Sequence, residues 1–170
     1  MDVAGSSERD APSEVRIRRA RFEDLATILR LIERSIAEGC RVDYDAAQRR
    51  VVFLAYAQHL FSEAVAGFDT LVAERPRDGR IVATTQLDPD SGRLRALFVD
   101  GDLQGRGFGH LLIEAIIMRA RAHGLTQMHG AMSLGAVPFY TRHGFRPYDG
   151  PDRLVHGGIV VPISPMRRSL

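Results

Sequence analysis

The sequence has no lysine, no asparagine and no tryptophan, and its single cysteine is Cys40. Because all 23 basic residues are arginine, a Schiff-base lysine and the lysine of a Walker phosphate loop are both excluded. One cysteine forms neither an intrachain disulfide nor a multi-cysteine zinc site. Two large enzyme classes are therefore excluded, and a cytoplasmic location is expected.

The sequence also lacks long apolar runs and any strong charge imbalance. Its 45% hydrophobic and 26% charged residues are typical of a globular domain, and the net charge of +2 indicates no basic patch for nucleic acid. Residues 1–13 are acidic and rich in small residues without the apolar core of a signal peptide, which predicts a disordered tail. Residues 14–170 then suit one domain that binds neither nucleic acid nor membrane.

Two helices are predicted near the N-terminus. The first has apolar residues at helical spacing, with Asp24 as its expected N-cap and Gly39 as its stop. The second begins with a capping box at Asp45 and runs towards Phe61. Because the second helix is apolar on more than one side, we expect it to be largely buried.

Strands and two further helices follow. A helix is predicted from residue 108 to 124, and a short one ends at Gly144. The predicted strands lie at 15–17, 70–73, 81–85, 94–99, 128–133, 145–148 and 159–163. The order β-α-α-β-β-β-α-β-α-β-β predicts an α+β fold, in which about four helices flank a central mixed, mostly antiparallel sheet of about six or seven strands.

The segment Q-G-R-G-F-G at 104–109 stands between a strand and an amphipathic helix, where free main-chain amides at the positive end of the helix dipole bind anions. Its glycines remove side chains where phosphate oxygens approach. The Rossmann fingerprint G-x-G-x-x-G belongs to the first βα turn and does not fit. We expect Gly107→Asp to weaken anion binding with little cost to folding, provided that φ at Gly107 is negative.

Two motifs resemble the GCN5-related N-acetyltransferase (GNAT) superfamily. L-F-V at 97–99 with the glycine loop is similar to motif A, whose pattern Q/R-x-x-G-x-G/A is met by Gln104, Gly107 and Gly109. A-V-P-F-Y at 136–140, followed by H-G-F, is similar to motif B. The resemblance implies acetyl-CoA, or a similar acyl-CoA, as cosubstrate and a primary amine, on a small molecule or a peptide, as acceptor in a ternary complex. Similar proteins are often homodimers.

The resemblance also implies roles for individual residues. The backbone amide of Val99 would stabilise the oxyanion, and Tyr140 would act as general acid at the CoA sulfur. The pantetheine arm would pair with the strand at 97–99, where two neighbouring strands splay apart. The implied cofactor-binding residues are Leu97, Phe98, Val99, Gln104, Gly105, Arg106, Gly107, Phe108, Gly109 and Ser133.

Several of these residues have alternative interpretations from the sequence alone. Tyr140 at helical spacing is also typical of core packing, Arg106 of a solvated loop, and Ser133 of a strand end. The strand R-L-R-A-L at 93–97 has no carboxylate, so a general base is missing; His129 and Asp88 are candidates, as is a water relay. The missing carboxylate favours an alternative function, a noncatalytic acyl-CoA-binding sensor.

The cysteine and the other histidines are not expected to take part in catalysis or metal binding. Cys40 is expected to be inert, and the histidines at 110, 123 and 143 are expected to face solvent. Because no histidine pair has a zinc-binding spacing such as H-E-x-x-H, we predict no metal. The acceptor is expected near Tyr44, Phe53, Arg95 and Tyr148, a position taken from the family layout.

Overall fold

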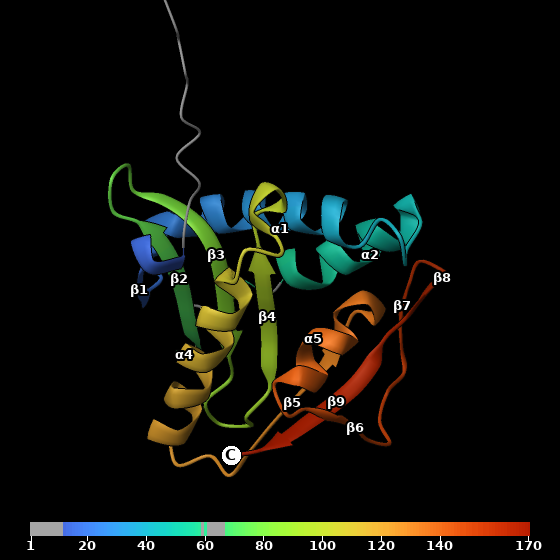
Figure 1. The fold of residues 1–170 in the computed structure, drawn as a ribbon. Helices are drawn as coiled ribbons and strands as arrows, with labels where there is room; N and C mark the ends of the chain where they lie inside the picture. Colours follow the sequence, from blue (N-terminus) through green and yellow to red (C-terminus); the bar gives the residue numbers. More distant parts are fainter. Residues whose placement is uncertain (1–11, 59, 61–66) are drawn as a thin grey trace, which may run out of the picture.

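The structure, a computed structural model, describes residues 12–58, 60 and 67–170. Nearly all of the predicted tail, and Phe61 at the predicted end of the second helix, lie outside these residues. Figure 1 shows the arrangement of helices and strands. The helices are α1 (Leu25–Gly39), α2 (Ala46–Ala57), α4 (Phe108–Ala122) and α5 (Val137–Arg142). Short 3-10 turns are η1 (Pro12–Glu14), η2 (Phe22–Asp24), η3 (Gly101–Leu103) and η4 (Leu134–Ala136).

The strands form one large antiparallel sheet and two smaller ones. The large sheet has the order β1-β2-β3-β4, with β1 (Arg16–Arg19), β2 (Asp69–Arg75), β3 (Arg80–Leu87) and β4 (Leu94–Val99). A second sheet has the order β5-β9-β6, with β5 (Gln127–Met132), β9 (Ser164–Ser169) and β6 (Arg146–Pro147). The hairpin β7-β8 comprises Arg153–His156 and Ile159–Pro162. A parallel bridge between Arg93 and His129 joins β4 to β5, so the arrangement is mixed and mostly antiparallel, as predicted.

Helices cover both faces of the large sheet, and this explains its nearly continuous apolar strands. Along β2, Leu71 and Ala73 belong to the core shared with α4, whereas Val72 between them belongs to the core shared with α1 and α2. Phe108 is fully buried at the start of α4 and stabilises that helix on the sheet by about 1.5–3 kcal/mol. The two cores fix the position of the loop before α4.

The capping predictions for the first two helices had different outcomes. Asp45 accepts the Gln48 N–H and forms the predicted capping box of α2, and α1 ends at Gly39 as expected. Asp24 occupies the N-cap position of α1, but its carboxylate makes no capping bond to that helix. It accepts instead from the Arg18 guanidinium at 2.6 and 3.1 Å, because a charged partner competes successfully for the same oxygens.

The chain after α5 differs most from the prediction. We expected two closing strands, and the structure has four, so the described residues contain nine strands instead of six or seven. The sequence S-P-M-R-R-S of β9 has no alternating apolar pattern, and its strand conformation comes from pairing with β5 over the full length of both strands. The strand expected at 145–148 is reduced to Arg146–Pro147; the Tyr148 N–H still donates to the Pro165 carbonyl at 3.2 Å, but Pro165 has no N–H to return the second hydrogen bond of that pair.

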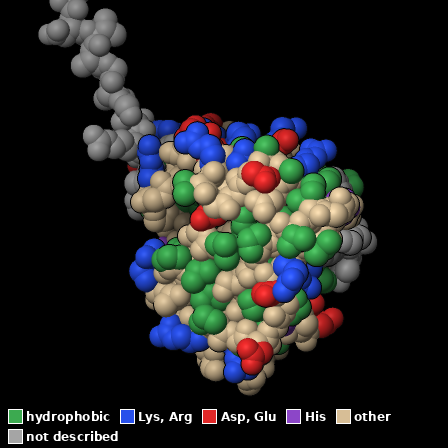
Figure 2. All heavy atoms as spheres, turned by 90° about the vertical axis from the view of Figure 1, so that its right-hand side faces the viewer, with side chains coloured by type: hydrophobic (Ala, Val, Ile, Leu, Met, Phe, Trp, Pro, Cys, Tyr) green, Lys and Arg blue, Asp and Glu red, His purple; other side chains and the backbone are tan. Residues whose placement is uncertain are grey.

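The surface carries some apolar side chains. Figure 2 shows hydrophobic atoms gathered in the middle of the face that lies on the right of Figure 1, with charged groups around them. On the hairpin, the register partners Val155 and Val160 are both exposed. Within the described part of the chain, no helix combines the length and the apolar character needed to span a membrane.

Candidate active site

The strands β4 and β5 diverge along their length (Figure 1), and a cleft lined by residues 97–99 of β4 and by Ser133 after β5 lies there. Among the described residues, the bridge recorded between the two strands is Arg93–His129, where the His129 N–H donates to the Gly92 carbonyl at 3.1 Å. Beyond it, β4 pairs with β3 alone. The Asp100 N–H donates to Val82 on β3, and hydrogen-bonding direction alternates along a strand, so the N–H groups of Val99 and Leu97 point away from β3. The predicted splay is present, with main-chain groups directed towards it.

The glycine loop closes one end of this cleft. Gly107 is the N-cap of α4, and the first intrahelical bond runs from the Leu111 N–H to the Gly107 carbonyl at 3.2 Å. The N–H groups of Phe108, Gly109 and His110 therefore have no acceptor within the helix. Three amides at the positive end of a 15-residue helix form an anion site.

The three loop glycines have different physical roles. Gly105 and Gly107 adopt φ of +76° and +93°, a region that L side chains rarely occupy. At Gly109 an added Cβ would lie 3.3 Å from the Phe139 ring. The expectation that Gly107→Asp costs little stability required a negative φ, and this condition is not met.

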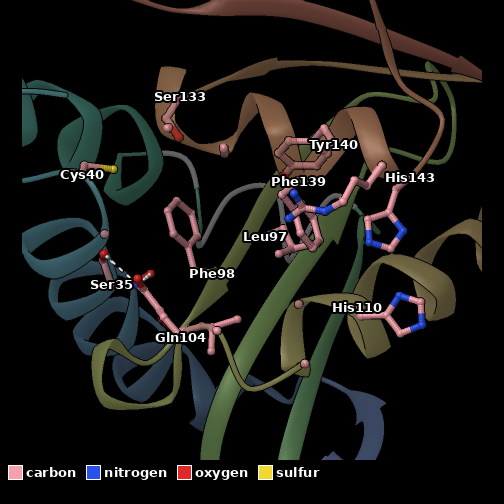
Figure 3. Close-up of a pocket in the computed structure, with 18 residues that line it drawn as sticks. Ser35, Cys40, Leu97, Phe98, Gln104, His110, Ser133, Phe139, Tyr140 and His143 are labelled. Carbon is pink, nitrogen blue, oxygen red and sulfur yellow. Dashed lines mark hydrogen bonds between the residues drawn. The ribbon is translucent and has the colours of Figure 1, made fainter. Parts of the chain in front are cut away.

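Two polar side chains, the buried Asp100 and the exposed Gln104, hold the loop in place. Asp100, 2% exposed, accepts the Arg34 guanidinium at 3.0 and 2.9 Å and Arg80 at 2.7 Å. Burial alone would raise the pKa of Asp100, but the hydrogen bonds from Arg34 and Arg80 lower it overall. The Gln104 amide donates to the Ser35 carbonyl and hydroxyl, each at 3.3 Å (Figure 3). The end of β4 and the loop are thereby fixed to α1.

Most of the predicted site residues line a single cleft of about 740 Å³ (Figure 3). The predicted residues brought together there are Leu97, Phe98, Val99, Gln104, Gly105, Gly107, Gly109, Ser133 and Tyr140. Arg106 is exposed and Phe108 is buried in the core, and neither is among the lining residues. Phe108 can therefore contribute its main-chain amide and not its ring.

Tyr140 lies on α5 at the boundary between the cleft and a second cavity. Its ring is 6% exposed and packs edge-to-face on Phe139 and Phe145, with centroids 5.2 and 5.4 Å away. Burial, with a smaller contribution from Tyr56, raises the pKa of Tyr140 well above its ordinary value. Both interpretations from the sequence therefore apply: the ring packs in the core, and the residue also faces the cleft.

The second cavity, about 60 Å³ in volume, lies on the α2 side of Tyr140. Of the positions expected for an acceptor, Tyr44 and Arg95 line this cavity, whereas Phe53 and Tyr148 do not. Tyr56 lines it too, and burial is the main cause that raises the pKa of its hydroxyl to about 12. The sequence analysis did not single out Tyr56. A hydroxyl-bearing side chain in a largely apolar helix could have indicated it, because a buried tyrosine hydroxyl usually has a polar partner or a role in a site.

Neither general-base candidate lines the cleft or the second cavity. The Asp88 carboxylate accepts the Asp90 N–H at 2.9 Å and the Ser91 hydroxyl at 2.6 Å in the β3–β4 turn. Burial would raise the pKa of Asp88, but these hydrogen bonds lower it overall. His129 lies on β5 opposite Arg167.

Cys40 and Ser133 line both cavities. Burial raises the pKa of the Cys40 thiol, the Asp43 carboxylate raises it further, and Ser133 partly opposes both effects. A protonated thiol agrees with the expected inert Cys40. Ser133 both ends β5 and faces the cleft, so the structure is compatible with both of its sequence interpretations.

The prediction for the histidines was incomplete. His110 and His143 line the cleft, with ring centroids 5.1 Å apart, and the His143 side chain is only 12% exposed. His123 is exposed, but its Nε2 lies 2.6 Å from the buried Asp69 carboxylate. Glu114 joins the first pair, and the ligand atoms of His110, Glu114 and His143 lie within 4.8 Å of one another. The prediction of no metal rested on sequence spacing alone and did not anticipate this cluster.

Comparison with known proteins identifies the family and the fold. The family model described as an acetyltransferase (GNAT) domain matches residues 42–170. The comparison with curated proteins finds no match. Among solved structures, a GCN5-related N-acetyltransferase from Rhodopseudomonas palustris, also described as an aminotransferase of class II, aligns with a TM-score of 0.81 and 25% identity over 92% of this chain and 96% of that one.

Two other structures show the same fold at lower identity. PaiA N-acetyltransferase from Thermoplasma acidophilum, solved with coenzyme A, has a TM-score of 0.74 and 17% identity over 92% of this chain and 99% of that one. Ribosomal-protein-alanine N-acetyltransferase from Brucella melitensis has a TM-score of 0.65 and 21% identity over 91% of this chain and 99% of that one. Because the family model covers most of the sequence, and the fold and the glycine loop agree with it, the chain belongs to the GNAT acetyltransferase family, which implies acyl transfer from acetyl-CoA.

Proposed function

We propose that the protein is an N-acetyltransferase that passes the acetyl group of acetyl-CoA to a primary amine by direct attack in a ternary complex. One observation carries this proposal: the cleft and the second cavity adjoin. A thioester in the cleft and an amine in the second cavity would therefore meet at their boundary. The shared residues are Cys40, Leu97, Phe98, Ser133, Ala136 and Tyr140.

The cleft suits acetyl-CoA. The free amides of Phe108, Gly109 and His110 supply donors for a diphosphate, and the glycines leave room for its oxygens. The outward N–H groups of Leu97 and Val99 offer an extended pantetheine arm the hydrogen bonds of an added strand. The volume of about 740 Å³ lies in the usual range for a ligand pocket.

Acetyl-CoA supplies a thioester whose carbonyl carbon is attacked by the amine nitrogen. The C–N bond forms as the C–S bond breaks; the nitrogen loses a proton, and the departing sulfur gains one. The Val99 N–H would stabilise the negative charge that develops on the carbonyl oxygen. Because β3 leaves this N–H unused and the Gln104–Val99 hydrogen bond fixes the strand, the donor is positioned before the substrate binds.

Tyr140 would donate a hydrogen bond to the departing sulfur. The reference pKa of tyrosine, about 10, already exceeds that of a thiol, about 8.5, so complete proton transfer is uphill by roughly 2 kcal/mol. Because burial raises the pKa of Tyr140 further, a hydrogen bond that leaves the proton on the phenol fits better than full transfer to sulfur. The proton would then reach the thiolate from solvent or from the amine.

The acceptor is proposed to be small, because a cavity of about 60 Å³ holds only a few water-sized groups. Among the described residues, no carboxylate lines the cleft or the second cavity, so the amine would arrive unprotonated or lose its proton through water. This feature also favours the alternative function, a noncatalytic acyl-CoA sensor.

The decisive experiment is a screen of small primary amines, amino acids and peptides with acetyl-CoA, in which released CoA thiol is followed continuously. An acetyltransferase releases thiol in proportion to the amine, and mass spectrometry finds the acetylated amine. Reactions without amine and reactions with Tyr140→Phe are the controls. Tight acetyl-CoA binding without turnover on any acceptor would favour the sensor and contradict the proposed activity.

A further inference from the structure

Two imidazoles and a carboxylate converge at the edge of the cleft. His110 and Glu114 are one helical turn apart on α4, and His143 directly follows α5. One ligand atom of each lies within 4.8 Å of the others, and His143 Nδ1 is 3.5 Å from Glu114 Oε1. The proposed acetyl transfer uses none of these side chains, so their convergence is not explained by that chemistry.

The three side chains are held by rigid elements. Residues four apart on a helix share one face, which directs His110 and Glu114 to the same side of α4. The His143 N–H donates to the carbonyls of Phe139 and Tyr140 at 3.3 and 3.0 Å, and its own carbonyl accepts Arg168 Nη1 at 2.7 Å. The His143 ring lies between Phe139, at 4.6 Å, and His110, at 5.1 Å between centroids (Figure 3).

The donor set selects a class of metal. Two imidazole nitrogens and a carboxylate oxygen suit Zn²⁺ and similar transition metals, whereas Ca²⁺ and Mg²⁺ prefer sets made of oxygen atoms alone. Tetrahedral Zn²⁺ binds such ligands at about 2.0–2.2 Å, which sets the ligand atoms roughly 3.4 Å apart. The observed ligand atoms lie within 4.8 Å of one another, so each pair has to approach by at most about 1.4 Å to reach this spacing.

The three side chains are also accessible, since His110 and Glu114 are both exposed. Glu114 is half exposed, so a metal ion can reach the group from solvent.

We propose that His110, Glu114 and His143 bind one Zn²⁺ ion, or a transition metal of similar preference, beside the cleft. Three protein ligands leave the fourth tetrahedral position for water or another ligand. Because His110 and His143 also line the cleft, the ion would lie next to the site proposed for acetyl-CoA. This site is separate from acetyl transfer and can be tested without any assay of activity.

The test is calorimetric titration of the untagged full chain with Zn²⁺, together with visible absorption after addition of Co²⁺, which reports the geometry of coordination. We expect one site per chain and a tetrahedral Co²⁺ spectrum. His110→Ala and Glu114→Gln should each weaken Zn²⁺ binding at least about 10-fold, since even second-shell changes cost that much. His156→Ala, which removes an exposed histidine of β7 outside the cluster, should leave binding unchanged.

His110 and Glu114 are exposed, so both variants should fold, and thermal unfolding without metal checks this. Absence of saturable Zn²⁺ binding to the unaltered chain would overturn the proposal. Binding that both His110→Ala and Glu114→Gln leave unchanged would place the metal at other groups and would overturn it equally.

Discussion

The side-chain amide of Gln104 donates a hydrogen bond of 3.3 Å to the carbonyl oxygen of Val99. This bond joins the loop proposed to bind the diphosphate to the strand proposed to bind the thioester. The same amide also reaches Ser35 on α1, and an added Cβ on Gly39 would lie only 2.9 Å from it. The family motif residue Gln104 therefore has a structural role that can be measured separately from cofactor contact.

Replacing Gln104 by alanine should loosen the loop. We expect a loss of about 1 kcal/mol or less in the free energy of unfolding, because the hydrogen bonds are partly exposed, together with weaker CoA binding. Urea unfolding and calorimetric titration with CoA measure the two effects. Gln127→Ala, at an exposed position of β5, is the matched control and should change neither. Unaltered CoA affinity in Gln104→Ala would show that the loop holds its shape without this residue.

Tyr140→Phe should lower kcat about 10- to 1000-fold, the scale of losing one hydrogen bond to charge that develops in the transition state, while CoA affinity changes little. Its ring packing is kept, since only the hydroxyl is removed. Tyr148→Phe is the control, because Tyr148 lies outside both cavities, with Arg167 5.6 Å from its ring. Equal rates for the unaltered chain and Tyr140→Phe would remove Tyr140 from the mechanism.

The pH dependence of kcat tests the state of the same hydroxyl. Because burial raises the pKa of Tyr140 above its ordinary value of 10.0, the phenol stays protonated through the assay range. The rate should rise with pH as the acceptor amine loses its proton, without a fall caused by Tyr140. A descending limb near neutral pH that disappears in Tyr140→Phe would contradict this assignment.

Gly107→Asp should reduce both stability and CoA binding. A side chain at φ +93° costs about 1–2 kcal/mol, and the carboxylate would repel a diphosphate at the helix N-terminus. Gly124→Asp is the matched control, since Gly124 has φ +77° beyond the other end of α4. It should lose similar stability and keep its CoA affinity. If both variants bind CoA equally well, the loop is not the diphosphate site.

Asp69→Asn should destabilise the fold by roughly 1–3 kcal/mol, because it weakens the hydrogen bonds of a fully buried carboxylate. Asp69 accepts from Arg119 at two positions, both 2.9 Å, and from Arg19 at 2.5 Å. The exposed pair Asp152–Arg153 is the control, and Asp152→Asn should be nearly neutral in urea unfolding. If Asp69→Asn and Asp152→Asn lower the free energy of unfolding equally, the hydrogen bonds of the buried Asp69 carboxylate do not stabilise the fold more than an exposed ion pair.

The stability of the protein should fall in acid. Burial alone would raise the pKa of Asp69, but hydrogen bonds from Arg119 and His123 lower it overall below its ordinary value of 3.8. A carboxylate with a depressed folded pKa contributes stability above its unfolded pKa and loses it as pH falls through the folded pKa. Urea unfolding at a series of pH values from about 5 to 3 should therefore show a smaller decrease for Asp69→Asn than for the unaltered chain. If the free energy of unfolding falls equally with pH in Asp69→Asn and in the unaltered chain, Asp69 is not a source of the acid sensitivity.

Much of the fold was predictable because its signals are local. Helix α4 follows from apolar spacing and Gly124, α2 from the Asp45 capping box, and the β2–β4 meander from its turns. Strand β9 was missed because its conformation depends on pairing with β5, which lies more than thirty residues away in the sequence. Asp24 occupies the predicted N-cap position of α1, but the hydrogen bond of its carboxylate with Arg18 was not indicated by the capping pattern.

The site likewise has features that local sequence motifs predict and features that depend on the folded chain. The glycine loop and Tyr140 stand in sequence motifs, so their presence at one cleft could be predicted. The positive φ of Gly107 could not, because glycine also adopts negative φ. Nor could the convergence of His143 with His110, which depends on the packing of α5 beside α4.

A crystal structure of the chain with bound CoA tests the central claim most directly. The account predicts diphosphate oxygens within hydrogen-bond distance of the amides of Phe108, Gly109 and His110, and a pantetheine arm beside Leu97 and Val99 between β4 and β5. A diphosphate bound away from the start of α4, or an arm outside the splay of the two strands, would contradict it.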